Sequence, residues 1–187
     1  CDREGVVYEG RNTGMDPYKE RFAANTKART LKDAMSGADV FLGLSAPGIV
    51  NKAMMKTMSK APLVMALSNP VPEIMPEDVY DVQPKAIVCT GRSDYPNQVN
   101  NVLCFPYIFR GALDVGATAI NEEMKLACVE ALAELARQEA TAEVASVYEN
   151  EDLSFGSNYL IPKPFDPRLI ANIPVAVAKA AMETGVA

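Results

Sequence analysis

The chain has 187 residues, 49% of them hydrophobic, and a net charge of −6, a composition typical of an ordinary globular protein. Its 18 basic residues are scattered rather than clustered, so neither nucleic acid nor an anionic membrane is expected as a partner. The lack of histidine excludes a Ser-His-Asp triad and an HExxH zinc site.

The first half of the chain alternates short apolar runs with helical patterns. The segment from Thr30 to Asp33 has the form of a capping box, and its helix is expected to end near Gly37. Asn51 is expected to cap a short helix whose methionines fill the core, Met54, Met55 and Met58. Three apolar runs have the length of buried parallel strands, at residues 40–44, 63–67 and 86–90. This alternation predicts an α/β fold with a parallel sheet.

The second half is more helical. Asn121 opens a strong helical pattern, and residues 149–152 are expected to form an exposed loop. Asp166 and Pro167 are typical of a helix start, whereas Pro174 is expected to kink or split that helix, and Gly185 is a candidate C-cap. In the helix that Asn121 opens, one stripe is expected to face the core, and it consists of Met124, Ala127, Cys128, Ala131, Leu132 and Leu135.

A doubly wound nucleotide-binding domain normally begins with a strand, a GxGxxG loop and a helix, followed by an acidic residue that ends the second strand. The chain contains no GxGxxG, and Asp2 falls where that acidic residue is expected. We therefore expect an incomplete doubly wound parallel sheet with flanking helices and a helical C-terminal part, beginning partway through a domain.

The ends of the predicted strands are the candidate binding loops, because open α/β sheets bind ligands outside the carboxyl ends of their strands. These loops are GLSAPG at 43–48, ALSNPVPE at 66–73 and TGRSDYPNQVNN at 90–101. Ser45 and Gly48 would let a cofactor approach the backbone, although an ordinary turn explains them equally. Asn69 suits a turn before proline, but its neutral amide could also bind a carboxylate.

The remaining candidates are Asp2 and the doubled asparagine. The Asp2 carboxylate could accept hydrogen bonds from a ribose, or be a solvated residue at a chain end. Only one of Asn100 and Asn101 can cap the helix that follows, which leaves the other amide for a different role.

At these loops the sequence resembles the nucleotide-binding domain of bacterial malic enzymes. The resemblance covers essentially the whole chain and is strongest in SNPVPE and in TGRSDYPNQVNNVLCFPYIFRGALDVGATAINEEM. The segments YLIPKPFDPRLI and PVAVAKAAME are similar to the C-terminal helices of that family. Among its subgroups, the chain most resembles the large bacterial type in which a phosphotransacetylase-like domain can follow.

The resemblance implies oxidative decarboxylation of malate to pyruvate and CO2, with NAD or NADP as hydride acceptor and a divalent metal, Mg or Mn. It implies that Asn69 and Asn101 lie near the malate carboxylate and the nicotinamide, and that Asp2 binds the ribose. It also assigns cofactor-lining loops to Gly43, Leu44, Ser45 and Gly91.

The family's catalytic tyrosine and lysine and its metal ligands lie upstream of the matching region. Residues 1–187 are therefore interpreted as an NAD(P)-binding domain without the first strand, the GxGxxG loop and the catalytic domain. No catalytic residue and no metal ligand is expected in this segment, which alone should turn over no malate. The resemblance also implies a homo-oligomer, a dimer or larger.

The cysteines and the apolar runs bear on the location of the protein. The four cysteines show no CxxC pair, which predicts reduced thiols and a cytoplasmic location. No apolar run approaches the roughly 20 residues needed to span a bilayer.

Two alternatives remain open: a non-catalytic nucleotide-binding or regulatory module, and another NAD(P)-dependent dehydrogenase domain. The choice between NAD and NADP is also open. Arg3 would accommodate a phosphate, whereas the acidic side chain of Asp2 favours a free ribose hydroxyl.

Overall fold

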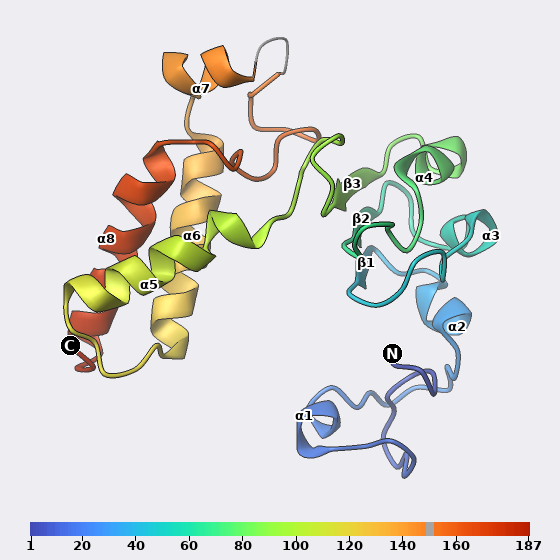
Figure 1. The fold of residues 1–187 in the computed structure, drawn as a ribbon. Helices are drawn as coiled ribbons and strands as arrows, with labels where there is room; N and C mark the ends of the chain where they lie inside the picture. Colours follow the sequence, from blue (N-terminus) through green and yellow to red (C-terminus); the bar gives the residue numbers. More distant parts are fainter. Residues whose placement is uncertain (149–151) are drawn as a thin grey trace. The chain divides into compact units, whose positions relative to one another are not determined.

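The structure, a computed structural model, describes residues 1–148 and 152–187. It divides into two compact units, Cys1–Val88 and Cys89–Ala187, both of which are drawn in Figure 1. Of the exposed loop predicted at 149–152, residues 149–151 lie outside the described residues.

The first unit begins with a loop-rich segment that leads into two short helices. Helix α1 (Pro17–Glu20) is capped by the side chain of Asp16. Helix α2 (Leu31–Met35) has the capping box predicted from the sequence, because the Thr30 hydroxyl and the Asp33 carboxylate each accept from the other's backbone N–H. Gly37 follows the helix with a φ of +74°, a conformation that glycine adopts without steric cost.

A parallel three-stranded sheet organises the binding loops. Its strands are β1 (Val40–Gly43), β2 (Leu63–Ala66) and β3 (Ile87–Thr90), in the order β1-β2-β3, and β3 spans the boundary between the units. Strands β1 and β2 pair in parallel from Val40 opposite Leu63 to Gly43 opposite Ala66. The carboxyl ends of these two strands therefore lie at the same edge of the sheet, as the predicted fold class requires.

Helices α3 (Lys52–Met55) and α4 (Pro76–Val82) build the core of the first unit together with α2. Asn51 caps α3 as predicted, and all three methionines of the predicted core are buried. The prediction that β1 is buried on both faces is wrong. Phe41 packs in the core, but Val40 and Leu42 are 53% and 55% exposed because the core residues from these helices gather on the Phe41 face alone.

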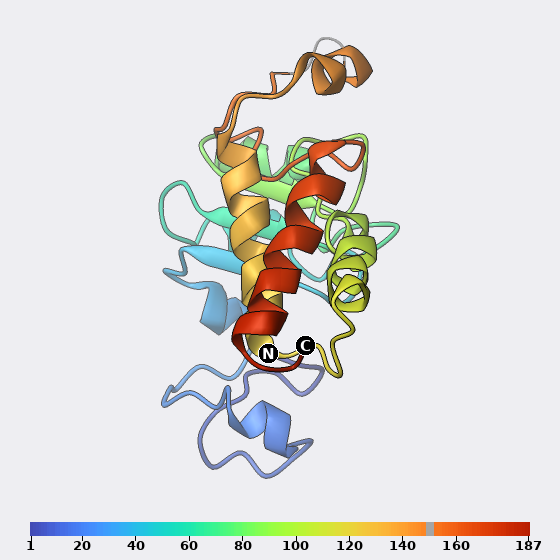
Figure 2. The same ribbon diagram turned by 90° about the vertical axis from the view of Figure 1, so that its left-hand side faces the viewer.

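The second unit is helical, as expected for the C-terminal part. It contains the 3-10 turn η1 (Asn101–Leu103) and the helices α5 (Phe105–Asp114), α6 (Glu122–Arg137), α7 (Ala142–Val147) and α8 (Arg168–Glu183). Helix α8 packs against both α5 and α6, and Figure 2 shows the three side by side. Asn121 caps α6, and the predicted stripe of this helix lies in or against the core.

Helix α8 tests the predictions made for both of its ends and for Pro174. Asp166 starts the helix as expected, because its carboxylate accepts from the Arg168 N–H, although regular helix begins only after Pro167. Pro174 does not split it, since both flanking halves are held by core contacts and the proline itself is buried. Gly185 ends the helix at a φ of +71°, and its N–H donates to Met182 O, which satisfies one of the last carbonyls.

Candidate functional site

The loops that follow β1 and β2 run beside each other at the carboxyl edge of the sheet. Leu67 N–H donates to Gly43 O at 3.1 Å where both strands end. Further along, Gly48 N–H donates to Pro72 O at 3.3 Å and Val50 N–H donates to Glu73 O at 3.1 Å. Two of the three loops predicted from the sequence are therefore brought together within the first unit.

Glu73 joins these two loops through its side chain, which is fully buried. Its Oε1 accepts from Ser45 N–H at 2.8 Å and from Ser45 Oγ at 3.4 Å, while its Oε2 accepts from Ser68 N–H at 3.0 Å. Both carboxylate oxygens thus bind backbone immediately after a strand end. The sequence did not indicate this residue, because a glutamate after two prolines reads as part of an exposed loop.

Gly43 makes room for that carboxylate. A Cβ atom at position 43 would lie 2.5 Å from Glu73 Cδ and 2.7 Å and 2.9 Å from its two oxygens. Real Cβ contacts are essentially never this short, so any larger residue would force the carboxylate to shift from its position against the end of β1. Gly43 was predicted to line a cofactor loop, and the structure adds this second reason for a glycine there.

Three predicted residues face outward at this edge. Leu44 is 75% exposed, and Ser45 and Asn69 are also exposed. The peptide bond between Asn69 and Pro70 is cis. Among the described residues, nothing accepts from or donates to the Asn69 amide, so both of its polar atoms are available to a ligand.

Asp2 lies in a different part of the first unit, in an isolated antiparallel bridge with Gly5 rather than in a strand. Its two oxygens each accept from Arg11 Nη2 at 2.8 Å, and Lys19 Nζ lies 3.0 Å from Oδ2. Hydrogen bonds from Arg11 and then Lys19 hold the pKa of the Asp2 carboxyl well below its usual range. Asp2 and Lys19 line a pocket of about 390 Å³, together with Phe22 and apolar neighbours.

The cations that pair with Asp2 are ones that the sequence did not indicate. Arg3, for which a phosphate contact was left open, is exposed and is not among the ion-pair partners of Asp2. Arg11 instead is buried, with a side chain only 4% exposed, and its Nη1 donates to Val6 O at 3.0 Å. The sequence could not single out Arg11 and Lys19, because they follow Asp2 by 9 and 17 residues across a turn-rich segment.

In the second unit, the amide-rich loop begins where β3 ends at Thr90, and Gly91 is half-buried there. Asn100 caps η1, since its Oδ1 accepts from Val102 N–H at 3.0 Å. Asn101 is exposed, and its amide bonds to no other described residue. The prediction that one of the two asparagines is the cap is confirmed, and the cap is Asn100.

Asn97 in the same loop is a buried residue whose side-chain hydrogen bonds the sequence did not indicate. It is 3% exposed and has a φ of +54°. Its Nδ2 donates to Ser157 O at 2.7 Å, and its Oδ1 accepts from Leu160 N–H at 2.8 Å. Asparagine tolerates this backbone conformation better than most residues, and the amide holds the loop against a segment 60 residues further on.

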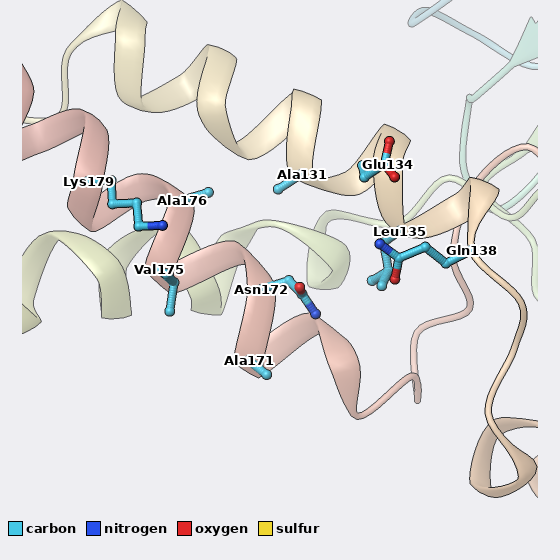
Figure 3. Close-up of a pocket in the computed structure, with 9 residues that line it drawn as sticks. All are labelled: Ala131, Glu134, Leu135, Gln138, Ala171, Asn172, Val175, Ala176 and Lys179. Carbon is cyan, nitrogen blue, oxygen red and sulfur yellow. The ribbon is translucent and has the colours of Figure 1, made fainter.

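Two other features of the second unit contain none of the predicted site residues. Cys104 and Cys128 lie with their Sγ atoms 3.2 Å apart, and burial raises the pKa of the Cys128 thiol to about 12. Between α6 and α8 lies an open pocket of about 320 Å³, drawn in Figure 3, whose polar side chains are Glu134, Gln138, Asn172 and Lys179. No further group points into this pocket to suggest a ligand.

Within residues 1–148 and 152–187, no group of three or more Cys, Asp or Glu side chains is placed to hold a metal ion. No helix in this part of the chain combines the length and the apolar character needed to cross a membrane.

A parallel sheet with flanking helices and polar loops at its carboxyl edge defines an α/β domain of the ligand-binding type. A family model described as the malic enzyme NAD-binding domain matches residues 1–152. The chain therefore belongs to the malic enzyme family, through its NAD-binding domain, and the resemblance seen in the sequence is confirmed.

Individual relatives agree with this assignment. The chain is 62% identical over its whole length to the NADP-dependent malic enzyme of Escherichia coli and covers 25% of that protein. It is 58% identical to the NAD-dependent malic enzyme of Rhizobium meliloti, of which it covers 24%. The crystal structure of Entamoeba histolytica malic enzyme superimposes with a TM-score of 0.82 and 33% identity, over 100% of this chain and 37% of that one. The chain thus spans about a quarter of the length of these two curated relatives.

Proposed function

We propose that the protein to which this chain belongs catalyses the oxidative decarboxylation of malate to pyruvate and CO2, with reduction of NAD(P)+. The observation that carries this proposal is the family match over residues 1–152. Neutral amides and backbone at the loops after the strands are consistent with it. In this proposal residues 1–187 form the NAD(P)-binding domain, and the proton-transferring residues lie elsewhere in the protein.

Within the chain, the proposed roles follow from the exposed groups. Asn69 and Asn101 present free amides, which can donate to the malate carboxylate without repelling a cationic nicotinamide ring. Gly43, Leu44, Ser45 and Gly91 lie directly at the ends of strands, where backbone can contact the dinucleotide. The bound dinucleotide supplies the acceptor for the hydride from C2 of malate.

The divalent metal, Mg or Mn, is assigned to residues outside this chain. The described residues hold no group of acidic or thiol side chains suited to a metal ion.

We infer that the cofactor is NADP rather than NAD. Asp2 is already paired with Arg11 and Lys19, so its negative charge is compensated and opposes a ribose 2′-phosphate less than a free carboxylate would. Lys19 lines the pocket beside Asp2, and in this proposal its half-buried ammonium pairs with such a phosphate. The NADP-dependent relative in Escherichia coli agrees with this choice, although the similar Rhizobium meliloti enzyme is NAD-dependent.

Two further properties are proposed, a cytoplasmic location and a homo-oligomeric state. All four cysteines are free in the structure, which fits a reducing, cytoplasmic location. A homo-oligomer, a dimer or larger, is proposed from the family, and the molar mass of the full-length protein in solution tests it.

The deciding experiment is an assay of the full-length protein with malate, Mn²⁺ and either NADP+ or NAD+. We expect malate-dependent formation of NADPH together with pyruvate in equal amounts, and slower formation of NADH. A non-catalytic nucleotide-binding module would bind NADP+ without turnover. Turnover of glutamate or another substrate in place of malate would assign the chain to a different dehydrogenase.

A further inference from the structure

Glu73 is a fully buried acidic side chain to which the proposed reaction gives no role. Burying a carboxylate is unfavourable unless hydrogen bonds replace its lost hydration. Here the replacement comes from Ser45 N–H, Ser45 Oγ and Ser68 N–H. No Lys or Arg pairs with this carboxylate among the described ion pairs, so these neutral donors alone hold it.

The bonds of Glu73 are divided between the two loops. Oε1 binds the loop after β1, and Oε2 binds the loop after β2. Ser45 is itself a proposed cofactor contact, and Ser68 directly precedes Asn69, a proposed substrate contact. The backbone of Glu73 is separately anchored through its carbonyl, which accepts from Val50 N–H. A single side chain therefore ties both proposed contacts to one anchored point.

We propose that Glu73 is a positioning residue, whose carboxylate fixes the loops after β1 and β2 at the spacing that the dinucleotide and the substrate require. This inference rests on the proposed function, because that function is what gives the two loops their ligands. Hydrogen bonds to an ionised acceptor are shorter and stronger than those to a neutral one. Small displacements of contact groups lower enzymatic rates by large factors.

Gly43 supports this role over a purely space-filling one. A Cβ atom at position 43 would lie within 2.9 Å of the carboxylate carbon of Glu73 and of both its oxygens. The end of β1 is thus shaped to receive a planar carboxylate rather than a bulky apolar side chain. A side chain that only filled space would need no hydrogen-bond donors around it. Each carboxylate oxygen of Glu73 instead accepts a hydrogen bond from a backbone N–H.

The decisive variant is Glu73→Gln in the full-length protein. Glutamine has the same shape, but its amide has one acceptor oxygen, and its NH2 group would face the N–H of the other loop. One of the two loops is then released while the side-chain volume is kept. We expect a rise of about tenfold or more in the KM for NADP+, together with a fall in kcat, because both the cofactor and the substrate contact shift. Glu130→Gln on the exposed face of α6 is the matched control and should leave both constants unchanged.

The outcomes separate positioning from a merely structural role. A loss of thermal stability with KM and kcat unchanged per folded molecule would overturn the inference, as would kinetic constants within about twofold of the wild type. If Glu73→Gln does not fold, Glu73→Asp keeps the charge and both acceptor oxygens on a shorter stem. It should give a raised KM, and an unchanged KM in that folded variant would also overturn the inference.

A wild-type protein without malate turnover would contradict the proposed function, not the positioning role. In that case, titration with NADP+ compares the dissociation constants of wild type and Glu73→Gln directly. Weaker binding by the variant supports the role of Glu73, and equal binding rejects it.

Discussion

Gly111 on α5 lies directly against Pro174 on α8. A Cβ atom at position 111 would be 2.5 Å from Pro174 O and 2.8 Å from Val177 Cβ. Both glycine and proline normally weaken a helix interior, yet here each lies at the contact between the two helices. The close approach of α5 to α8 therefore depends on the absence of a side chain at position 111.

We predict that Gly111→Ala destabilises the helical unit, by about 1–3 kcal/mol from overpacking. This outweighs the gain of roughly 1 kcal/mol in helix propensity. Gly156→Ala is the control, since its Cβ would meet only Ser154 O at 3.7 Å. The thermal midpoint of the full-length protein measures both variants, and an equal or higher midpoint for Gly111→Ala would contradict the packing argument.

Asn97 is predicted to hold the amide-rich loop through its two side-chain hydrogen bonds. Asn97→Gly keeps the positive φ accessible and removes only the amide, at a cost of roughly 1–3 kcal/mol for the lost buried bonds. The direct readout is hydrogen exchange at the Leu160 N–H, which donates to Asn97 Oδ1. Its exchange should accelerate in Asn97→Gly. Unchanged protection would show that the Asn97 side chain is not needed to hold the loop.

Asn100 and Asn101 should respond to alanine in opposite ways. Asn100→Ala removes a helix cap and is expected to cost about 1 kcal/mol of stability. Asn101→Ala removes an exposed amide without a protein partner, so stability should hardly change. In the full-length protein it should instead lower kcat/KM for malate far more than Asn100→Ala does. An unchanged kcat/KM would remove Asn101 from the proposed site.

The acid side of the stability profile should depend on Asp2. Its pKa is lowered in the folded state, so its contribution is present above the unfolded value of about 3.9 and is lost as the pH falls below it. Asp2→Asn should therefore destabilise the protein at neutral pH and flatten the decline of stability below about pH 4.

Arg11→Met should raise the Asp2 pKa more than Lys19→Met, as followed by carboxyl NMR. The reverse order would show that Lys19 is its main partner.

Cys104 and Cys128 should form a disulfide when the full-length protein is treated with diamide, which accepts the two hydrogens of the thiols. Their Sγ atoms are 3.2 Å apart, so little movement is needed. Mass spectrometry after alkylation should find a cross-link between these two peptides, and Cys128→Ser should abolish it. Because burial raises the pKa of Cys128, the reaction should be slow at neutral pH and faster in alkaline buffer. If both thiols are still fully alkylated after diamide treatment, the closeness of the two Sγ atoms would be contradicted.

Much of the secondary structure was predictable because its signals are local. The caps at Thr30, Asn51 and Asn121 and the glycine at Gly185 act on backbone groups within one helical turn. The apolar runs likewise identify the three strands of the sheet from neighbouring residues alone. Of the two outcomes predicted for Pro174, a split does not occur, because the helix is held by contacts with other elements, which a local rule does not include.

The sequence by itself determined the sheet, the helix starts, the family resemblance and the loops that carry the candidate site. Only the tertiary structure decided what holds those loops. Glu73 reaches Ser45 from 28 residues away, and Asn97 reaches Ser157 across 60 residues. A polar side chain becomes buried only when distant backbone supplies its hydrogen bonds. Because the donors and acceptors that satisfy Glu73 and Asn97 are brought near by folding, no local pattern distinguishes these residues from exposed ones.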